Sequence, residues 1–298
     1  MARRTPLQRR RVIVAYLFLL PTLAGLIVFL FVPLVWGIGI SFTNYVPGVP
    51  WRWVGLENYR RVFTDEVVRI SARNVLKYVI GVIPFLISVP LLVAFLLNRE
   101  FWGIGVFRSA IYFPHITSMV VVATVFIYIY RFDGPLNQIL SRFFDLLGLK
   151  WRRIAFLQNA AWAMAAVVFL TWFKSTGYYS VLYLAGLQNV PADLVEAAMI
   201  DGAGWWQRLW FVILPLIRPM ATLVVVICTI GAVKLFGEVF VMTGGGPGLA
   251  TQSLMLTVYQ EAFQMLHFGY ASALAIVVAA VILVLTLINI KVSERGAY

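Results

Sequence analysis

The sequence predicts an all-α protein, a polytopic membrane bundle of six transmembrane helices. Its 298 residues are 62% hydrophobic and only 12% charged, whereas soluble domains have roughly 45–50% apolar and about 25% charged residues. Long runs lack Lys, Arg, Asp and Glu altogether, the first of them from residue 12 to 51. Such runs reach the ~20 residues that cross a bilayer. A soluble core of this length cannot bury so much apolar surface, so lipid must cover much of it.

The charge and the reactive side chains exclude several other classes of protein. The formal net charge is +12, but the basic residues stand in short segments between apolar runs, which argues against a nucleic-acid partner. The single cysteine, Cys228, lies within an apolar run and cannot form an intrachain disulfide. Since His115 and His267 are the only histidines, we expect no metal site and no catalytic residues.

Six apolar segments are expected to be helices, because a spanning segment must satisfy its backbone hydrogen bonds internally. In chain order they cover residues 12–42, 73–97, 106–130, 156–186, 216–242 and 268–291. The first is much longer than the roughly 7–15-residue core of a secretory signal, so we interpret it as a retained anchor. Prolines predict kinks in the first two segments. These are Pro21, Pro33, Pro84 and Pro90.

The orientation in the cell membrane rests on the first segment. Basic residues divide evenly between the two sides of the six-helix topology, so their total decides nothing. Five arginines, however, precede the first helix within eleven residues, and the first helix usually dominates orientation. We therefore place both termini in the cytoplasm. The expected organisation is a tail of residues 1–11, a membrane domain of residues 12–291 and a second tail of residues 292–298.

The loop of residues 189–216 is the longest segment on the predicted cytoplasmic side. Pro191 suits a first helical position, and acidic residues follow it near the positive end of the helix dipole. Gly202 is able to end this short helix. By itself, the amphipathic pattern followed by a Trp-rich turn is also typical of a helix that lies on lipid headgroups.

The same loop resembles the EAA loop of permease subunits from binding-protein-dependent ABC importers. The resemblance rests on Glu196-Ala-Ala, on Gly202 and on the Val-Ile-Leu-Pro sequence that ends at Pro215, where Val212 replaces the usual Ile. Other segments look like those of the sugar-permease branch, which contains the maltose and glycerol-phosphate permeases. They are AYLFLLP from residue 15, SFTNY from 41, VGLENY from 54, AGLQ from 185, TGGGP from 243 and FGYASA from 268.

This resemblance implies the type I ABC importer permease fold and makes the loop a coupling helix. In the family the coupling helix docks on a separate ATPase, whose closure on ATP rocks the membrane bundle between inward-open and outward-open states. The implied ATPase-coupling residues are Glu196, Ala197, Ala198, Asp201, Gly202 and Gly204. The implied partners are a second permease subunit, two ATP-binding subunits and an extracytoplasmic solute-binding protein.

The chain itself is expected to be no enzyme. It contains no Gly-x-x-x-x-Gly-Lys-Ser/Thr sequence for a nucleotide's phosphates, so we expect ATP and Mg on the partner ATPase and no cofactor here. The glycine-rich stretch from Gly244 to Gly248 lacks a following Lys and is interpreted as a tight turn.

The solute path is expected on the fourth and fifth helices. Lys234 and Glu238 are four residues apart and therefore share a helix face, either as a structural salt bridge or as lining of the path. By resemblance, Lys174 is expected to be architectural. The candidate path residues are Ser175, Tyr178, Lys234 and Glu238, with helix packing as the alternative role at each.

These observations predict a permease that imports a di- or oligosaccharide or a related polyol. A glycerol phosphate or another anionic polyol is the alternative solute. A six-helix channel or secondary transporter would need neither an ATPase nor the EAA pattern, and the sequence lacks the internal repeats common in secondary carriers. A membrane-embedded enzyme would need a carboxylate pair or a metal cluster at a helix end, which the sequence does not provide.

Overall fold

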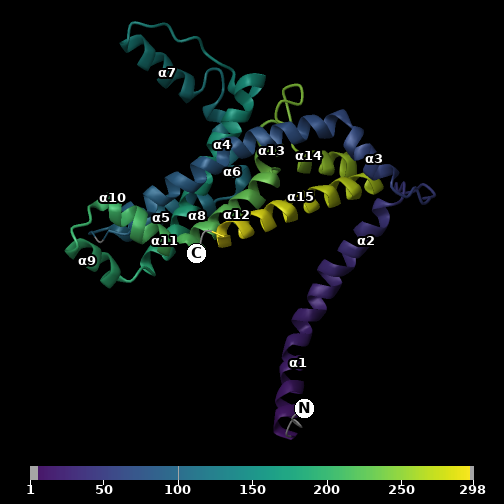
Figure 1. Cartoon of the computed structure of the whole chain (residues 1–298). Helices are drawn as coiled ribbons and strands as arrows, with labels where there is room; N and C mark the ends of the chain where they lie inside the picture. Colours follow the sequence, from purple (N-terminus) through teal and green to yellow (C-terminus); the bar gives the residue numbers. More distant parts are fainter. Residues whose placement is uncertain (1–5, 100, 296–298) are drawn as a thin grey trace. The chain divides into compact units, whose positions relative to one another are not determined.

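The computed structural model describes residues 6–99 and 101–295, and most of these residues are helical. No strand occurs in these two ranges, although one antiparallel bridge joins Thr43 and Trp53. The all-α prediction is therefore confirmed (Figure 1). The chain divides into a smaller unit, residues 1–62 with 259–276, and a larger unit, residues 63–258 with 277–298.

The smaller unit begins with one long helical stretch. It consists of α1 (Pro6–Leu26), the π-helical turn η1 (Ile27–Phe31) and α2 (Val32–Ser41). Its residues 14–41 are long and apolar enough to cross a membrane, and its spanning window has no residue buried within the chain. The irregular turn lies directly before Pro33, whose ring removes a backbone donor from the helical ladder. The predicted first helix is thus present as a single exposed element.

Hydrogen bonds within the smaller unit join residues 41–58 to one another and to Gly269. The Asn58 side-chain amide donates to the carbonyls of Ser41 and Thr43, both at 2.8 Å. The Gly269 N–H donates to the Tyr45 carbonyl at 3.2 Å. A Cβ atom on Gly269 would overlap the Thr43 carbonyl, so only glycine permits this approach. Three segments that resemble permease motifs therefore form one structural cluster.

The larger unit is built on α4 (Glu66–Leu97) and α8 (Ala160–Gln188), which lie side by side. With 32 and 29 residues, the two helices measure about 48 and 44 Å, which exceeds the ~30 Å hydrocarbon core of a bilayer. The buried hydroxyl groups of Tyr78 and Thr171 link them with a 2.8 Å hydrogen bond. These two helices form the scaffold on which the other elements pack.

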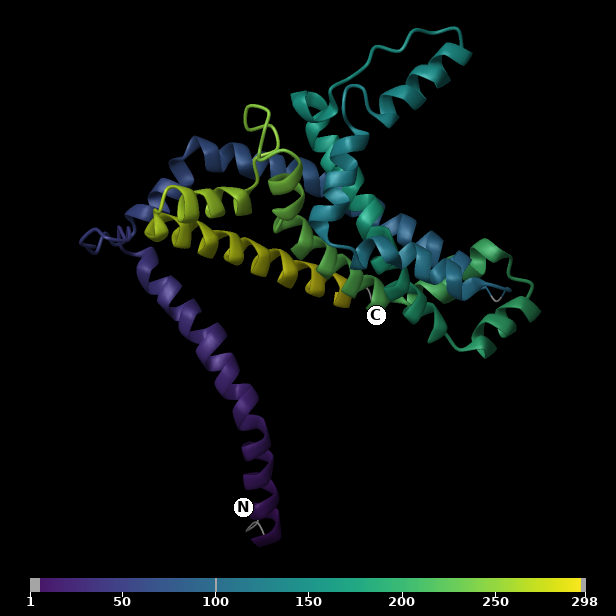
Figure 2. The same ribbon diagram turned by 180° about the vertical axis from the view of Figure 1, so that it is seen from behind.

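Shorter helices surround this pair, as Figures 1 and 2 show. α5 (Ile104–Ile116) and α12 (Arg218–Val233) pack against α8, and α13 (Gly237–Met242) packs against α6 (Met119–Ile129). The other elements are α3 (Glu57–Thr64), α7 (Pro135–Leu146), η2 (Phe156–Gln158), α9 (Ala192–Ile200), α10 (Trp205–Arg208), η3 (Leu209–Ile213), α11 (Leu214–Leu216), α14 (Leu254–Tyr259), η4 (Gln260–Gln264) and α15 (Phe268–Arg295).

Two predicted helices are broken. The third segment splits into α5 and α6, which meet at 92°, close to Pro114 inside α5. The fifth segment is interrupted at residues 234–236, between α12 and α13, and α12 is also bent by 70° from the helical stretch before it. The prediction of continuous helices over 106–130 and 216–242 is therefore wrong. Such breaks are tolerated in membranes where protein groups satisfy the freed backbone.

The number of spans is only partly settled by the described residues. Three helices are long and apolar enough to cross a membrane, and counting each bent pair as one span raises the number to five. The remaining predicted span is α8, which is long enough but carries polar residues such as Lys174 and Thr176. The sixth span therefore stays a prediction. α4 runs without interruption through Pro84 and Pro90.

Candidate functional site

The predicted coupling loop folds into a short helix, α9, with a well-defined end. Gly202 follows the helix with φ +79°, a value that favours glycine. The Ala203 N–H donates to the Ala198 carbonyl at 2.9 Å, and the Gly202 N–H donates to the Met199 carbonyl at 3.0 Å. These two bonds form the Schellman arrangement of a helix C-terminus. The expectation that Gly202 ends the helix is confirmed.

The start of α9 and the next turn are also held by local structure. α9 begins at Ala192, so Pro191 precedes the helix instead of occupying its first position. Asp193 lies in the first turn, where a negative charge is favourable. Beyond the glycine, Gly204 precedes α10 and its N–H donates to the Gln207 side-chain carbonyl at 2.8 Å. The loop therefore consists of two short, locally capped helices with a hinge between them.

Most of the loop is exposed. No residue of α9 is buried. Ala198 is half-buried, while the other predicted coupling residues, Glu196, Ala197, Asp201, Gly202 and Gly204, are exposed. Large apolar side chains are uncovered as well, with Ile200 86% and Trp206 66% exposed. A rigid helix that presents charged and apolar groups together is suited to dock on a partner protein.

The two ends of this loop are anchored in the bundle. Leu209 and Ile217 are buried where the chain returns to the membrane helices. A Cβ atom on Gly186, near the end of α8, would approach the Met220 side chain to 2.9 Å. This close contact packs the end of α8 against the start of α12 beside the loop.

Lys174 holds the break between α5 and α6. Its ammonium group donates to the carbonyls of Pro114, His115 and Thr117 at 3.3, 2.8 and 2.9 Å. These carbonyls lack helical partners because α5 ends at Ile116, and a cation is favourable at the negative end of a helix. The geometry agrees with the expectation that Lys174 is architectural.

The expected pairing of Lys234 with Glu238 is wrong. Lys234 ends α12 and Glu238 lies in the separate helix α13, so the four-residue spacing does not place the side chains on one face. No ion pair joins them, since the salt bridges in the described ranges involve other residues. Glu238 instead interacts electrostatically with Lys174 of α8. Lys234 is left exposed.

Ser175 and Tyr178 lie one turn apart on α8 and are both half-buried. The Tyr178 ring stacks on His115 of α5, with ring centroids 4.4 Å apart and planes 13° from parallel. His115 Nδ1 is buried without a hydrogen-bond partner. The structure thus brings Tyr178 and His115 together.

Sequence reasoning missed the part that α5 plays in this region. Gly177 lies so close to α5 that a Cβ atom there would overlap the Ile111 carbonyl. Pro114 within an apolar run was a signal for a break, but nothing local indicated that Lys174 would satisfy the carbonyls it frees. The missed residues are therefore His115, Ile111 and Gly177.

The fold and the exposed loop define an integral membrane protein of the permease class. The family described as "Binding-protein-dependent transport system inner membrane component" matches residues 82–295. The chain therefore belongs to this family, as the motifs from Glu196 to Pro215 implied.

Relatives and solved structures agree with this assignment. The chain is 34% identical to the probable ABC transporter permease protein YurN of Bacillus subtilis, over 95% of this chain and 97% of that protein. It is 31% identical to the trehalose/maltose transport system permease protein MalF of Thermococcus litoralis, over 97% and 96%. A chain of a bacterial ABC transporter that imports the acidic polysaccharide alginate matches with a TM-score of 0.81 and 25% identity, over 96% of each chain.

Proposed function

We propose that this chain is one permease subunit of an ATP-driven importer that translocates a carbohydrate by alternating access. The observation that carries the proposal is α9, a capped and exposed helix in a chain of the binding-protein-dependent family. Relatives named for sugars support the solute class, among them the multiple sugar-binding permease MsmF of Streptococcus mutans at 31% identity. If the chain were a channel or a secondary transporter, no ATPase would be available for α9 to dock on.

In this proposal α9 docks on one of two ATP-binding subunits, which hold ATP and Mg. Glu196 and Asp201 face outward and are placed to pair with basic residues of the ATPase. Ala197 is small enough to allow close approach of its backbone. The glycines after the helix, Gly202 and Gly204, let the rigid helix pivot when the ATPase closes.

Charge reversal at Glu196 tests the coupling. In proteoliposomes that contain the complete transporter, Glu196→Lys should lower solute uptake per ATP hydrolysed at least tenfold, because it repels the basic cleft. Glu66→Lys is the matched control, since it makes the same substitution at a side chain that is 75% exposed at the start of α4. Uptake by Glu196→Lys at the wild-type rate would contradict the coupling role.

The solute path is proposed along Ser175, Tyr178, Lys234 and Glu238. Lys234 is exposed and forms no ion pair with Glu238, which favours the second candidate solute class, a glycerol phosphate or another anionic polyol. Lys234→Ala should then weaken uptake of an anionic solute more than uptake of its neutral analogue, with Lys291→Ala as the control. If Lys234→Ala takes up each of the two solutes as well as the wild type does, Lys234 does not line the path.

The remaining subunits follow from the same proposal. A second permease is expected to cover part of the uncovered stretch of residues 14–41, and a solute-binding protein is expected on the outer face. Affinity purification of the tagged chain should bring down a second permease and an ATPase. Uptake by the chain alone in liposomes without ATP would instead support the secondary-transporter alternative.

The orientation in the inner membrane is proposed with both termini in the cytoplasm. In that topology α9 faces the cytoplasm and α7 faces outward. A membrane-impermeant maleimide applied to intact cells should label Asp145→Cys and leave Met199→Cys unlabelled. The reverse pattern would invert the topology.

A further inference from the structure

The connection between α6 and α8, residues 131–159, forms a hairpin that carries α7. We call it the α7 hairpin. It lies at the end of α8 opposite to α9, and both views show it projecting from the ends of α6 and α8 (Figures 1 and 2). α6 ends at Ile129 and α7 begins at Pro135. Residues 130–134 therefore join α6 to α7, and residues 147–159 return the chain to α8.

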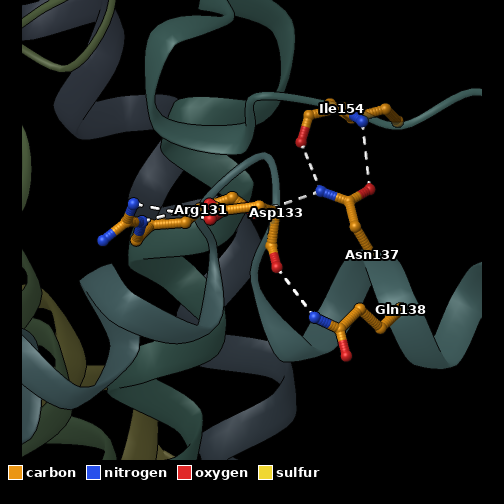
Figure 3. A network of polar contacts seen from close by, with 5 residues as sticks. All are labelled: Arg131, Asp133, Asn137, Gln138 and Ile154. Carbon is orange, nitrogen blue, oxygen red and sulfur yellow. Dashed lines mark hydrogen bonds and ion pairs between the residues drawn. The ribbon is translucent and has the colours of Figure 1, made fainter.

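A buried asparagine fastens α7 to the returning chain, as Figure 3 shows. Asn137 donates to the carbonyls of Ile154 and Arg131 at 2.8 and 3.2 Å. Its side-chain oxygen accepts from the Ile154 N–H at 3.0 Å and from the Trp151 indole at 3.1 Å. Because these bonds occupy both ends of the amide, the orientation of α7 on its return segment is fixed.

The fixed helix leaves half of its apolar surface uncovered. Its helical periodicity places the apolar residues on one side and the polar residues on the other. The return segment covers only one edge of the apolar side, where Phe144 stacks on Trp151 with ring centroids 4.9 Å apart. Ile139, Phe143 and Leu146 remain 64%, 56% and 86% exposed. Within its unit, α7 therefore presents an apolar stripe to whatever surrounds it.

Basic side chains flank this stripe. Arg142 lies on the polar side of α7, and Lys150, Arg152 and Arg153 lie on the return segment, all exposed. None of these four forms an ion pair with an acidic residue of the described ranges. An uncovered apolar stripe next to unpaired cations is the composition of a helix that lies in the interface of an anionic membrane.

We propose that the α7 hairpin lies on the bilayer surface, with its apolar stripe in the acyl-chain boundary and its basic side chains on anionic phospholipid headgroups. Its direct connections to the ends of α6 and α8 keep the hairpin within reach of that interface. A docked protein would have to cover the stripe and also supply acidic groups to the return segment, whereas an anionic leaflet supplies both together. The hairpin then fixes the height of α8, and hence of the α5–α6 break, relative to the membrane.

Spin labels on the two sides of α7 test this placement. Single cysteines at Ile139 and Phe143, compared with Arg142 and Asp145, are introduced in a Cys228→Ala background of the complete transporter. The labelled protein is reconstituted into nanodiscs of phosphatidylcholine, with or without phosphatidylglycerol. Accessibility to oxygen, which concentrates in lipid, is compared with accessibility to a water-soluble nickel chelate. These readouts do not depend on transport, so they remain informative if the proposed function fails.

Labels at Ile139 and Phe143 should be several-fold more accessible to oxygen than to nickel, with the opposite ratio at Arg142 and Asp145. Addition of phosphatidylglycerol should move the labels at Ile139 and Phe143 deeper into the bilayer. Replacing Lys150, Arg152 and Arg153 by Gln should abolish that deepening, while the control Arg69→Gln should not. If the labels at Ile139 and Phe143 are accessible to the nickel chelate, the stripe lies in water. If they are accessible to neither oxygen nor the chelate, the stripe lies against protein. Either result overturns the proposal, as does deepening that survives the triple replacement.

Discussion

Replacement of Lys174 by Met removes the ammonium group that bridges the α5–α6 break and keeps a side chain of similar length. Three hydrogen bonds to the carbonyls of Pro114, His115 and Thr117 are lost. Hydrogen bonds inside membrane proteins contribute about 0.6 kcal/mol each by double-mutant cycles, and bonds to a charged donor contribute about 1.5 kcal/mol or more. The expected loss is therefore about 2–5 kcal/mol in the free energy of unfolding.

The assay is reversible unfolding of the purified protein by titration of a denaturing detergent into mild micelles. Lys291→Met is the matched control, because Lys291 is exposed near the end of α15 and donates none of these bonds. Its unfolding free energy should stay within about 0.5 kcal/mol of wild type. A change of that small size for Lys174→Met would refute the structural role of the ammonium group.

A double-mutant cycle with Glu238→Gln examines the second role of Lys174. Lys174 of α8 and Glu238 of α13 interact electrostatically, so removal of the Lys174 ammonium group takes this interaction from Glu238. The double mutant should recover about 0.5–3 kcal/mol relative to the sum of the single mutants. Strict additivity would show that the carboxylate does not depend on Lys174.

Three further substitutions have defined outcomes. Gly177→Val should lower the unfolding free energy by about 3 kcal/mol, because its side chain would overlap the Ile111 carbonyl and separate α5 from α8. Gly245→Ala should cost about 2 kcal/mol in the same assay, since Gly245 has φ +93° and a Cβ there would overlap the Gln252 side chain. Asn137→Ala should raise hydrogen exchange in the α7 hairpin about tenfold to hundredfold, through the loss of about 1–3 kcal/mol of local stability.

Each of these substitutions has a control in the same chain. Gly105→Ala places its methyl group in open space on α5 and should leave the unfolding free energy nearly unchanged. Gly248→Ala has a positive φ of 53° but no neighbour within 4 Å, so it gives the cost of a left-handed backbone without a steric contact. Gln138→Ala removes a single exposed hydrogen bond of 2.9 Å. Equal effects of test and control substitutions would contradict the assigned contacts.

Much of the functional loop could be predicted from the sequence because its structure is local. Pro191 and the acidic first turn lie at the start of α9 and Gly202 lies just after its end, and the bonds that end α9 join residues no more than five apart. The glycine turn from Gly244 to Gly248 is local in the same way, with positive φ at three of its glycines. Capping and turn formation depend on backbone conformation at neighbouring positions, which residue type largely sets.

The relation between Lys234 and Glu238 was predicted wrongly because it depends on contacts between distant segments. The helical spacing of Lys234 and Glu238 assumed an unbroken helix, yet the chain breaks at residues 234–236. Ser253 supports this break by donating to the Leu235 carbonyl at 2.6 Å. Helical periodicity across residues 234–236 contains no information about such a partner, so it cannot predict the break.

The sequence by itself determined that the chain is helical and membrane-embedded, that it belongs among binding-protein-dependent permeases, and where its exposed loop lies. Composition and short-range spacing carry that information, because hydropathy and helix caps depend on residues that lie within one or two helical turns of each other in the sequence. Only the tertiary structure decided that Lys174 serves the α5–α6 break and that the motifs at Ser41 and Phe268 meet. The physical reason is that freed backbone carbonyls in a membrane must find donors, and these donors come from helices far away in the sequence.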